Sequence, residues 1–118
     1  MDKTPEASVI LPARNAAETI RAVLDALARQ DCGTGRFEVL IGDDASTDGT
    51  GDLVRARRDP FRVESVRLER SGSEYWPAGP RNAALERAQG RVLIFLDADV
   101  LAAPGLVSAH LAAQSGER

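Results

Sequence analysis

Short apolar segments alternate with helical patterns along the whole chain, and this alternation limits the possible folds more than any other feature. The expected strands are residues 7–11, 37–41, 62–68 and 91–96. The expected helices begin near residues 15, 52, 80 and 104. A β-α-β-α order of this kind specifies a parallel sheet with helices on its faces, joined by right-handed crossovers. We therefore expect an α/β fold, a Rossmann-like three-layer sandwich with a mostly parallel central sheet.

Local signals predict where individual elements begin and end. Asn15, with Glu18 three residues later, has the pattern of a helix N-cap with a capping box. Pro80 suits the first turn of a helix, and Gly90 suits a C-terminal cap. The segment 62–68 alternates between apolar and polar residues with a slip at Ser65, which favours an edge strand. One face of the first helix carries apolar residues at helical spacing: Ile20, Val23, Leu24 and Leu27.

The length of 118 residues fits one compact domain covering 1–118. Hydrophobic residues make up 43% and charged residues 28%, which argues against disorder over most of the chain. No apolar run approaches the roughly 20 residues that cross a bilayer. The first residues, MDKTPEASVILP, lack the basic start and apolar stretch of a signal peptide. We therefore expect no transmembrane segment and a cytoplasmic location.

Charge and residue counts exclude several classes of function. The chain carries 15 basic and 18 acidic residues, a net charge of −3, which weighs against binding to nucleic acid. The single cysteine, Cys32, excludes an internal disulfide and a cysteine-built zinc site. The single lysine, Lys3, stands outside any GxxxxGK[ST] pattern, so the chain is not a P-loop NTPase.

Polar residues gather where three of the expected strands end. Residues 12–15 follow the first strand, 43–46 the second and 97–99 the fourth. In open parallel sheets, ligands bind beyond the carboxyl ends of the strands. These three segments are far apart in sequence, and we expect them to share one edge of the sheet.

The acidic residues of these segments have a structural and a functional interpretation. Asp97 and Asp99 follow an apolar strand one residue apart, a pattern that provides oxygen ligands for Mg²⁺ or Mn²⁺ beside a diphosphate. The same residues also occur in turns, where a carboxylate accepts backbone N–H groups. Asp43 and Asp44 allow both interpretations as well, because aspartate is favoured in turns and helix caps. Asp44 could instead accept a hydrogen bond from a base N–H or a ribose hydroxyl.

Three segments together carry a resemblance to a known family. SVILPARNAAETI, EVLIGDDASTDGT and GPRNAALERAQGRVLIFLDADV resemble the nucleotide-binding (N-terminal) half of inverting family 2 glycosyltransferases with the GT-A fold. The resemblance extends from about Ser8 to Val107, with the three motifs in the family order. It implies a nucleoside-diphosphate sugar as substrate, with a UDP-sugar favoured, and a divalent cation, Mn²⁺ or Mg²⁺, as cofactor.

The resemblance assigns the base and ribose to the first two motifs. Asp44 matches the family aspartate that hydrogen-bonds the base, usually uracil, and Asp43 belongs to the same motif. Pro12 and Ala13 match the backbone that runs along the base and ribose. Arg14 stands where the family often has an aromatic residue that packs on the base, and a guanidinium can also stack on a base.

The resemblance assigns the diphosphate end to the third motif. Asp99 matches the direct ligand of the metal, and Asp97 matches the position nearest the ribose or a water-mediated metal contact. Arg81 and Asn82 match an Arg-Asn pair near the nucleotide, where an arginine at a helix N-terminus suits electron-rich groups. Asn15 and Ala98, which lie within the same motifs, complete the predicted substrate-binding set.

Two departures from the family pattern concern the loop 72–77 and the end of the chain. Trp76 in that loop has two interpretations, a contact with ligand or an anchor for the loop. Family members continue into an acceptor-binding half that supplies the general base, and neither His110 nor Glu117 suits that role. We therefore expect a nucleotide-sugar-binding domain truncated before the acceptor-binding half, with the catalytic base unassigned and activity as an enzyme left open.

Two alternatives come from other classes of protein. A non-catalytic nucleotide-binding or interaction module could self-associate through the face that the missing half would cover. A receiver-type signalling domain also places acids at strand ends, but it needs a lysine at the end of a late strand. Lys3 precedes the first strand, which makes this alternative the weaker one.

Overall fold

A computed structural model describes residues 4–69 and 78–114 of the chain. In chain order, its elements are β1 (Ala7–Ala13), α1 (Ile20–Ala28), the 3-10 helix η1 (Thr34–Arg36), β2 (Phe37–Asp44), α2 (Thr50–Arg55), β3 (Arg62–Leu68), α3 (Ala78–Leu85), β4 (Val92–Phe95) and α4 (Leu106–Gln114). Trp76 and Glu117 lie outside the described residues, so the predictions made for them stay predictions.

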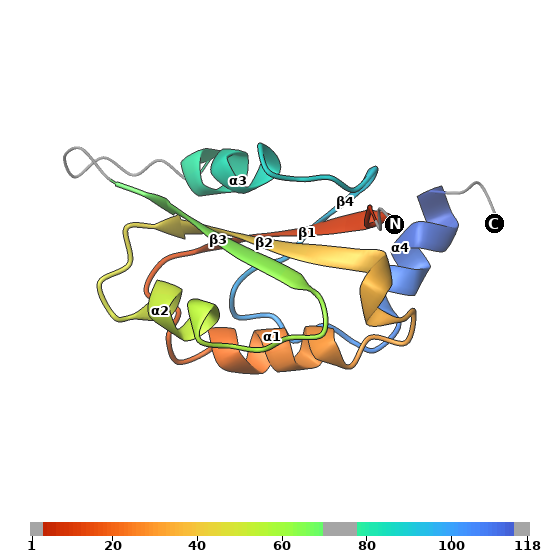
Figure 1. Ribbon diagram of the computed structural model, residues 1–118, viewed down its shortest axis with the longest axis horizontal. Helices are drawn as coiled ribbons and strands as arrows, with labels where there is room; N and C mark the ends of the chain where they lie inside the picture. Colours follow the sequence, from red (N-terminus) through yellow and green to blue (C-terminus); the bar gives the residue numbers. More distant parts are fainter. Residues whose placement is uncertain (1–3, 70–77, 115–118) are drawn as a thin grey trace.

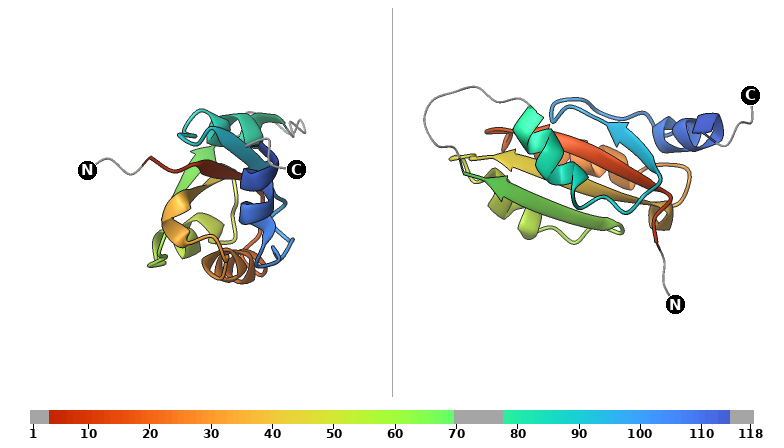
Figure 2. Two further views of the ribbon diagram at one scale, coloured as in Figure 1. Left: turned by 90° about the vertical axis from the view of Figure 1, so that its right-hand side faces the viewer. Right: turned by 90° about the horizontal axis from the view of Figure 1, so that it is seen from above.

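The described strands form one parallel sheet in the order β3-β2-β1-β4. Helix α3 covers one face, while α1 and α2 lie against the other (Figure 1). Helix α4 lies at the end of the sheet opposite the carboxyl ends of β2 and β3 (Figures 1 and 2). The three-layer α/β sandwich expected from the sequence is confirmed, and β3 is an edge strand as predicted.

The core lies mainly between the sheet and α1. Successive strand residues point to opposite faces, so Val9 and Leu11 face α1 while Ile10 faces α3. The four apolar residues predicted for one face of α1 are all fully buried in the larger cluster. A smaller cluster beneath α3 contains Ile10, Leu40 and Ala84. Most of the hydrophobic stabilisation therefore comes from the α1 side, and α3 is held over a narrower apolar base.

The predicted N-cap at Asn15 is wrong. Helix α1 begins at Ile20 with Thr19 as its N-cap, and Asn15 has a left-handed backbone with φ 49°. The side chain of Asn15 accepts a hydrogen bond from the backbone N–H of Thr47 at 2.8 Å instead of capping the helix. A contact between the loops that follow β1 and β2 has therefore replaced the local capping box.

The predicted C-cap at Gly90 is also wrong, because α3 already ends at Leu85. The backbone N–H of Gly90 donates to the hydroxyl of Ser8 at 2.8 Å. A Cβ added at Gly90 would lie 2.5 Å from the carbonyl carbon of Ala7. Glycine is needed here because the chain passes close to β1 as it enters β4, and not because a helix must end.

No helix among the described residues is long and apolar enough to span a membrane. The predicted cytoplasmic location stays a prediction.

Cys32 is half-buried and forms no disulfide, and burial raises the pKa of its thiol.

Candidate functional site

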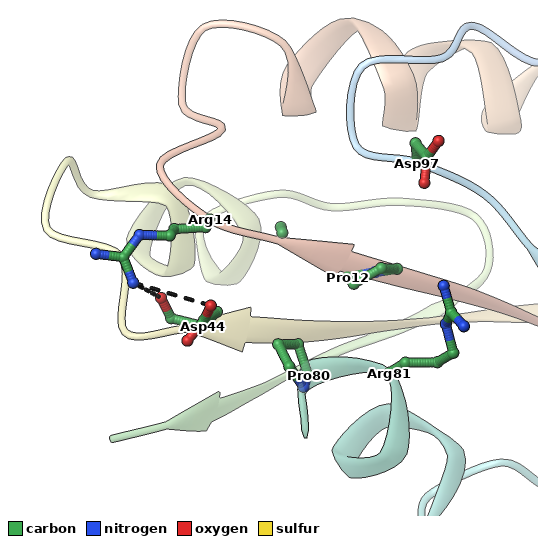
Figure 3. Close-up of a pocket in the computed structure, with 7 residues that line it drawn as sticks. Pro12, Arg14, Asp44, Pro80, Arg81 and Asp97 are labelled. Atoms are coloured by element: carbon green, nitrogen blue, oxygen red, sulfur yellow. Dashed lines mark hydrogen bonds and ion pairs between the residues drawn. The ribbon is translucent and has the colours of Figure 1, made fainter. Parts of the chain in front are cut away.

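A cavity of about 240 Å³ opens at the carboxyl ends of the strands (Figure 3). The ends of β1 and β2, the first half of α3 and the segment after β4 all contribute to it. Its described lining residues are Pro12, Ala13, Arg14, Asp44, Pro80, Arg81 and Asp97. Three distant polar segments therefore meet at one edge of the sheet, as the sequence predicted.

The cavity exists because β4 ends before its neighbour β1. The last paired residue of β4, Phe95, lies opposite Ile10, while β1 continues for three more residues to Ala13. The carbonyl of Ile10 faces β4, where it accepts from the N–H of Leu96 at 3.0 Å. Two residues on, the nitrogen of Pro12 faces the same side, and proline has no N–H to leave unpaired. Pro12 therefore fits a central strand at the point where its neighbour has ended.

An arginine and an aspartate lie together at the ends of β1 and β2 (Figure 3). Arg14 Nη1 donates to the backbone oxygen of Asp44 at 3.3 Å and lies 3.8 Å from Asp44 Oδ2. The Asp44 side chain is 11% exposed and that of Arg14 is 47% exposed. The next residues, Asn15 and Ala45, both have positive φ, so the chain turns sharply just after each of the paired side chains.

Hydrogen bonds within the loop after β2 fix the position of Asp44. The carboxylate of Asp43 is buried, accepts from the N–H of Ser46 at 3.1 Å and lies 3.7 Å from Arg67 Nη1. The hydroxyl of Ser46 accepts from the N–H of Asn15 at 2.9 Å. Asp43 and Asn15 thus shape the loops and do not line the cavity among the residues described.

Helix α3 approaches the sheet at a glycine of β2. A Cβ added at Gly42 would lie 1.8 Å from the backbone oxygen of Pro80 and 2.5 Å from its carbonyl carbon. No side chain can occupy that space, so the first half of α3 rests directly on the strand. This close approach brings Arg81 to the cavity that Asp44 also lines.

Asp97 and Asp99 lie in a turn that follows β4. The N–H of Val100 donates to the carbonyl of Asp97 at 3.2 Å, and the hydroxyl of Thr19 donates to the carbonyl of Ala98 at 2.8 Å. Both aspartates are exposed, and neither carboxylate has a hydrogen bond or ion pair with a residue of 4–69 or 78–114. The structural interpretation, in which the carboxylates of Asp97 and Asp99 accept backbone N–H groups and hold the turn, is therefore not found among the described residues.

The predicted site residues divide into two groups. Six line the cavity: Pro12, Ala13, Arg14, Asp44, Arg81 and Asp97. Five are absent from its described lining: Asn15, Asp43, Asn82, Ala98 and Asp99. Sequence reasoning missed Pro80 as a lining residue, although its place directly before Arg81 was a usable signal. The roles of all these residues toward a ligand stay predictions.

A second cavity, of about 210 Å³, is lined by residues at the opposite end of the sheet, including Glu38 and Phe61. The buried carboxylate of Glu38 accepts from the hydroxyl of Ser8 at 2.6 Å and the N–H of Gln89 at 2.7 Å, and it pairs with Arg62. These bonds join β1, β2, β3 and the approach to β4. We interpret this carboxylate as part of the framework of the fold.

Hydrogen bonds to Asp48, in the loop that follows β2, predict that the stability of the fold depends on pH. The Asp48 carboxylate accepts from Thr50 Oγ1 at 2.5 Å and from the N–H of Ala17 at 3.0 Å, and these bonds lower its pKa below the ordinary 3.8. Because the pKa of Asp48 is lower in the folded than in the unfolded protein, its ionised carboxylate stabilises the fold fully above about pH 4. This stabilisation is lost as the pH falls through the pKa of the folded state. Asp48→Asn should lower the thermal unfolding temperature near neutral pH and have less effect near about pH 2.5. An equal effect at both pH values would contradict this prediction.

The fold and the cavity define a class, an α/β domain whose ligand site lies at the carboxyl edge of a parallel sheet. Comparison with known sequences gives the family: a model described as glycosyl transferase family 2 matches residues 8–117. The chain belongs to this family. This assignment confirms the resemblance seen in the sequence motifs, and it disfavours a receiver-type signalling domain.

Individual relatives include proteins named as glycosyltransferases. Over 112 residues, the chain is 41% identical to validoxylamine A glucosyltransferase of Streptomyces hygroscopicus subsp. jinggangensis, covering 95% of this chain and 26% of that protein. Over 92 residues, it is 38% identical to the poly(ribitol-phosphate) beta-N-acetylglucosaminyltransferase TarS of Staphylococcus aureus, covering 78% of this chain and 16% of that protein. The chain therefore spans about a quarter or less of the length of these relatives.

Solved structures agree with the fold. The crystal structure of S. aureus TarS 1-349 in complex with UDP-GlcNAc matches with a TM-score of 0.82 and 32% identity, over 94% of this chain and 31% of that one. The mannosyltransferase PcManGT from Pyrobaculum calidifontis, in complex with GDP-Man and Mn²⁺, matches with a TM-score of 0.75 and 35% identity, over 96% and 33% of the two chains. The GT-A fold expected from the resemblance is confirmed.

Proposed function

We propose that this chain is the donor-binding part of an inverting glycosyltransferase. It binds a nucleoside-diphosphate sugar, with a UDP-sugar favoured, for transfer to an acceptor hydroxyl. The observation that carries the proposal is the single cavity that Asp44, Arg81 and Asp97 line together. Membership of glycosyl transferase family 2, and relatives whose structures contain UDP-GlcNAc or GDP-Man, support the same ligand class.

The arrangement of charge suggests how the donor lies in the cavity. At one end, the Asp44 carboxylate can accept a hydrogen bond from a base N–H, and the exposed Arg14 guanidinium can stack on the base. At the other end, Arg81 offers five N–H donors to the diphosphate. The backbone of Pro12 and Ala13 lies along the base and ribose in this proposal.

The residues after β4 fit a divalent cation. Oxygen ligands are those that Mg²⁺ and Mn²⁺ prefer, and Mg²⁺ is commonly held by one or two carboxylates together with substrate phosphates. No group of three or more metal-ligating side chains occurs in the described part of the chain, so the diphosphate would complete the coordination. Asp99 would hold the cation directly, with Asp97 beside it. When bound, the cation would neutralise charge that develops on the diphosphate leaving group.

The remaining predictions about the whole protein stay predictions. The catalytic base stays unassigned. Self-association through the face that an acceptor-binding half would cover stays a prediction.

Titration calorimetry with UDP, with and without Mn²⁺, tests the proposed function. We expect Mn²⁺ to tighten UDP binding by about tenfold, which corresponds to about 1.4 kcal/mol. Asp99→Asn should abolish this gain while leaving the metal-independent affinity unchanged, because Asp99 does not line the cavity itself. Asp31→Asn, at an exposed acid after the end of α1, is the matched control and should behave as the unaltered protein. An equal gain from Mn²⁺ in the protein with and without Asp99→Asn would count against the metal site.

A further inference from the structure

A large aromatic side chain on β4 has no role in the core. Phe95 is 52% exposed and belongs to neither of the hydrophobic clusters formed by the described residues. Leu93, two residues earlier on the same face of the strand, is similarly exposed at 43%. An exposed phenylalanine is not unusual by itself. Phe95 differs from Leu93 in that its ring lies against a charged side chain.

The Phe95 ring lies beneath the guanidinium of Arg81. The central carbon of that guanidinium is 5.4 Å from the ring centroid, within the range of a cation–π contact. Arg81 has no hydrogen bond or ion pair with any residue in the described ranges. The phenylalanine ring is thus the one recorded partner of this guanidinium in that part of the chain.

The type of contact determines what Arg81 can still do. A cation–π contact draws the charge of the guanidinium to the face of the ring, and it involves no hydrogen-bond acceptor. A carboxylate partner would occupy those donors and would compete with an anionic ligand. An aromatic partner restricts the position of the guanidinium without pairing its N–H groups with an acceptor, so they can still donate to an anionic ligand.

The position of Arg81 points to the part of the ligand that it contacts. Arg14 and Asp44 lie together near the ends of β1 and β2, while Arg81 and Asp97 lie on either side of Pro12, away from that pair (Figure 3). If the base lies at Asp44, the diphosphate reaches the end of the cavity that Arg81 lines. Asp97, which also lines that end, lies in the same turn as Asp99.

We propose that Phe95 is a positioning residue, whose ring holds the Arg81 guanidinium at the cavity in the orientation that binds the diphosphate of the ligand. This inference rests on the proposed function. It assigns to β4 a contribution to donor binding that acts through α3 and requires no contact between Phe95 and the ligand.

The test compares UDP and uridine binding in variants of Phe95. Phe95→Leu keeps an apolar side chain and removes the aromatic face, and we expect it to weaken UDP binding by about three- to tenfold. Phe95→Tyr keeps the face and should stay within about twofold of the unaltered protein. Uridine has no diphosphate, so its affinity should not change in either variant. A purely structural effect of Phe95→Leu would weaken uridine and UDP binding alike.

Two further variants complete the design. Leu93→Ala, on the same face of the same strand, should leave UDP affinity unchanged. In an Arg81→Met background, Phe95→Leu should have no additional effect, because the group that it orients is gone. UDP binding that is unchanged by Phe95→Leu, or weakened equally with and without Arg81, would overturn this role for Phe95. Absence of UDP and GDP binding by the unaltered protein would instead overturn the proposed function.

Discussion

Replacing Asp44 with asparagine is expected to weaken UDP binding by about 10- to 100-fold. A hydrogen bond to a charged group contributes about 1.5–3 kcal/mol, and the variant loses the charge of the proposed acceptor for the base. The Asp44 side chain is 11% exposed and lines the cavity, so little water competes with the ligand for it. Calorimetry with UDP gives the affinity, and thermal unfolding shows whether the variant is folded.

The control for this variant is Asp52→Asn, which neutralises an exposed carboxylate in α2 whose partner is Arg55. It should change neither UDP affinity nor its dependence on Mn²⁺. Uridine binding should fall with Asp44→Asn as UDP binding does, since we propose that Asp44 binds the base. Full UDP affinity in a folded Asp44→Asn variant would remove Asp44 from the site.

Replacing Gly42 with alanine is expected to destabilise the fold by about 3 kcal/mol and to abolish detectable UDP binding. Overpacking costs about 1–3 kcal/mol or more where neighbours cannot move, and the atom met here is the backbone oxygen of Pro80 at 1.8 Å. Either α3 moves away from β2 or the strand bends. Both changes displace Arg81 from the cavity. Urea unfolding measures the first effect and UDP calorimetry the second.

Gly35→Ala is the matched control, because a Cβ at Gly35 meets nothing within 4 Å and its φ is not positive. The same substitution there should change stability by less than about 1 kcal/mol and leave UDP binding intact. Equal unfolding free energies for the Gly42→Ala and unaltered proteins would show that α3 does not depend on this contact.

The sequence was informative about elements whose signals are local and repeated. The apolar spacing of α1 predicted Ile20, Val23, Leu24 and Leu27 as buried, and the alternation of elements predicted a parallel sheet with acids at its carboxyl edge. Both depend on periodicity, which is a property of a continuous segment. The grouping of Asp44 with Asp97 followed from the same topology.

The predictions that failed concern residues whose partners are distant in sequence. Asn15 has the signals of an N-cap, but its side chain binds Thr47, 32 positions later. Gly90 has the position of a C-cap, but it is a glycine because β1 lies against it. No sequence signal marks Gly42 or Phe95 as important. Gly42 matters because α3 rests on β2 there, and Phe95 matters because Arg81 lies over its ring. No local pattern encodes such contacts.

The proposed function requires that the nucleotide binds in one cavity at the carboxyl edge of the sheet, with its metal ion at the adjoining turn 97–99. An NMR titration of the ¹⁵N-labelled protein with UDP, followed by Mn²⁺, tests both positions most directly. We predict UDP-induced shifts at the amides of Arg14, Ala45 and Arg81, and paramagnetic broadening by Mn²⁺ centred on residues 97–99. Shifts gathered around Glu38 and Phe61, at the opposite end of the sheet, or broadening that avoids residues 97–99, would contradict the account.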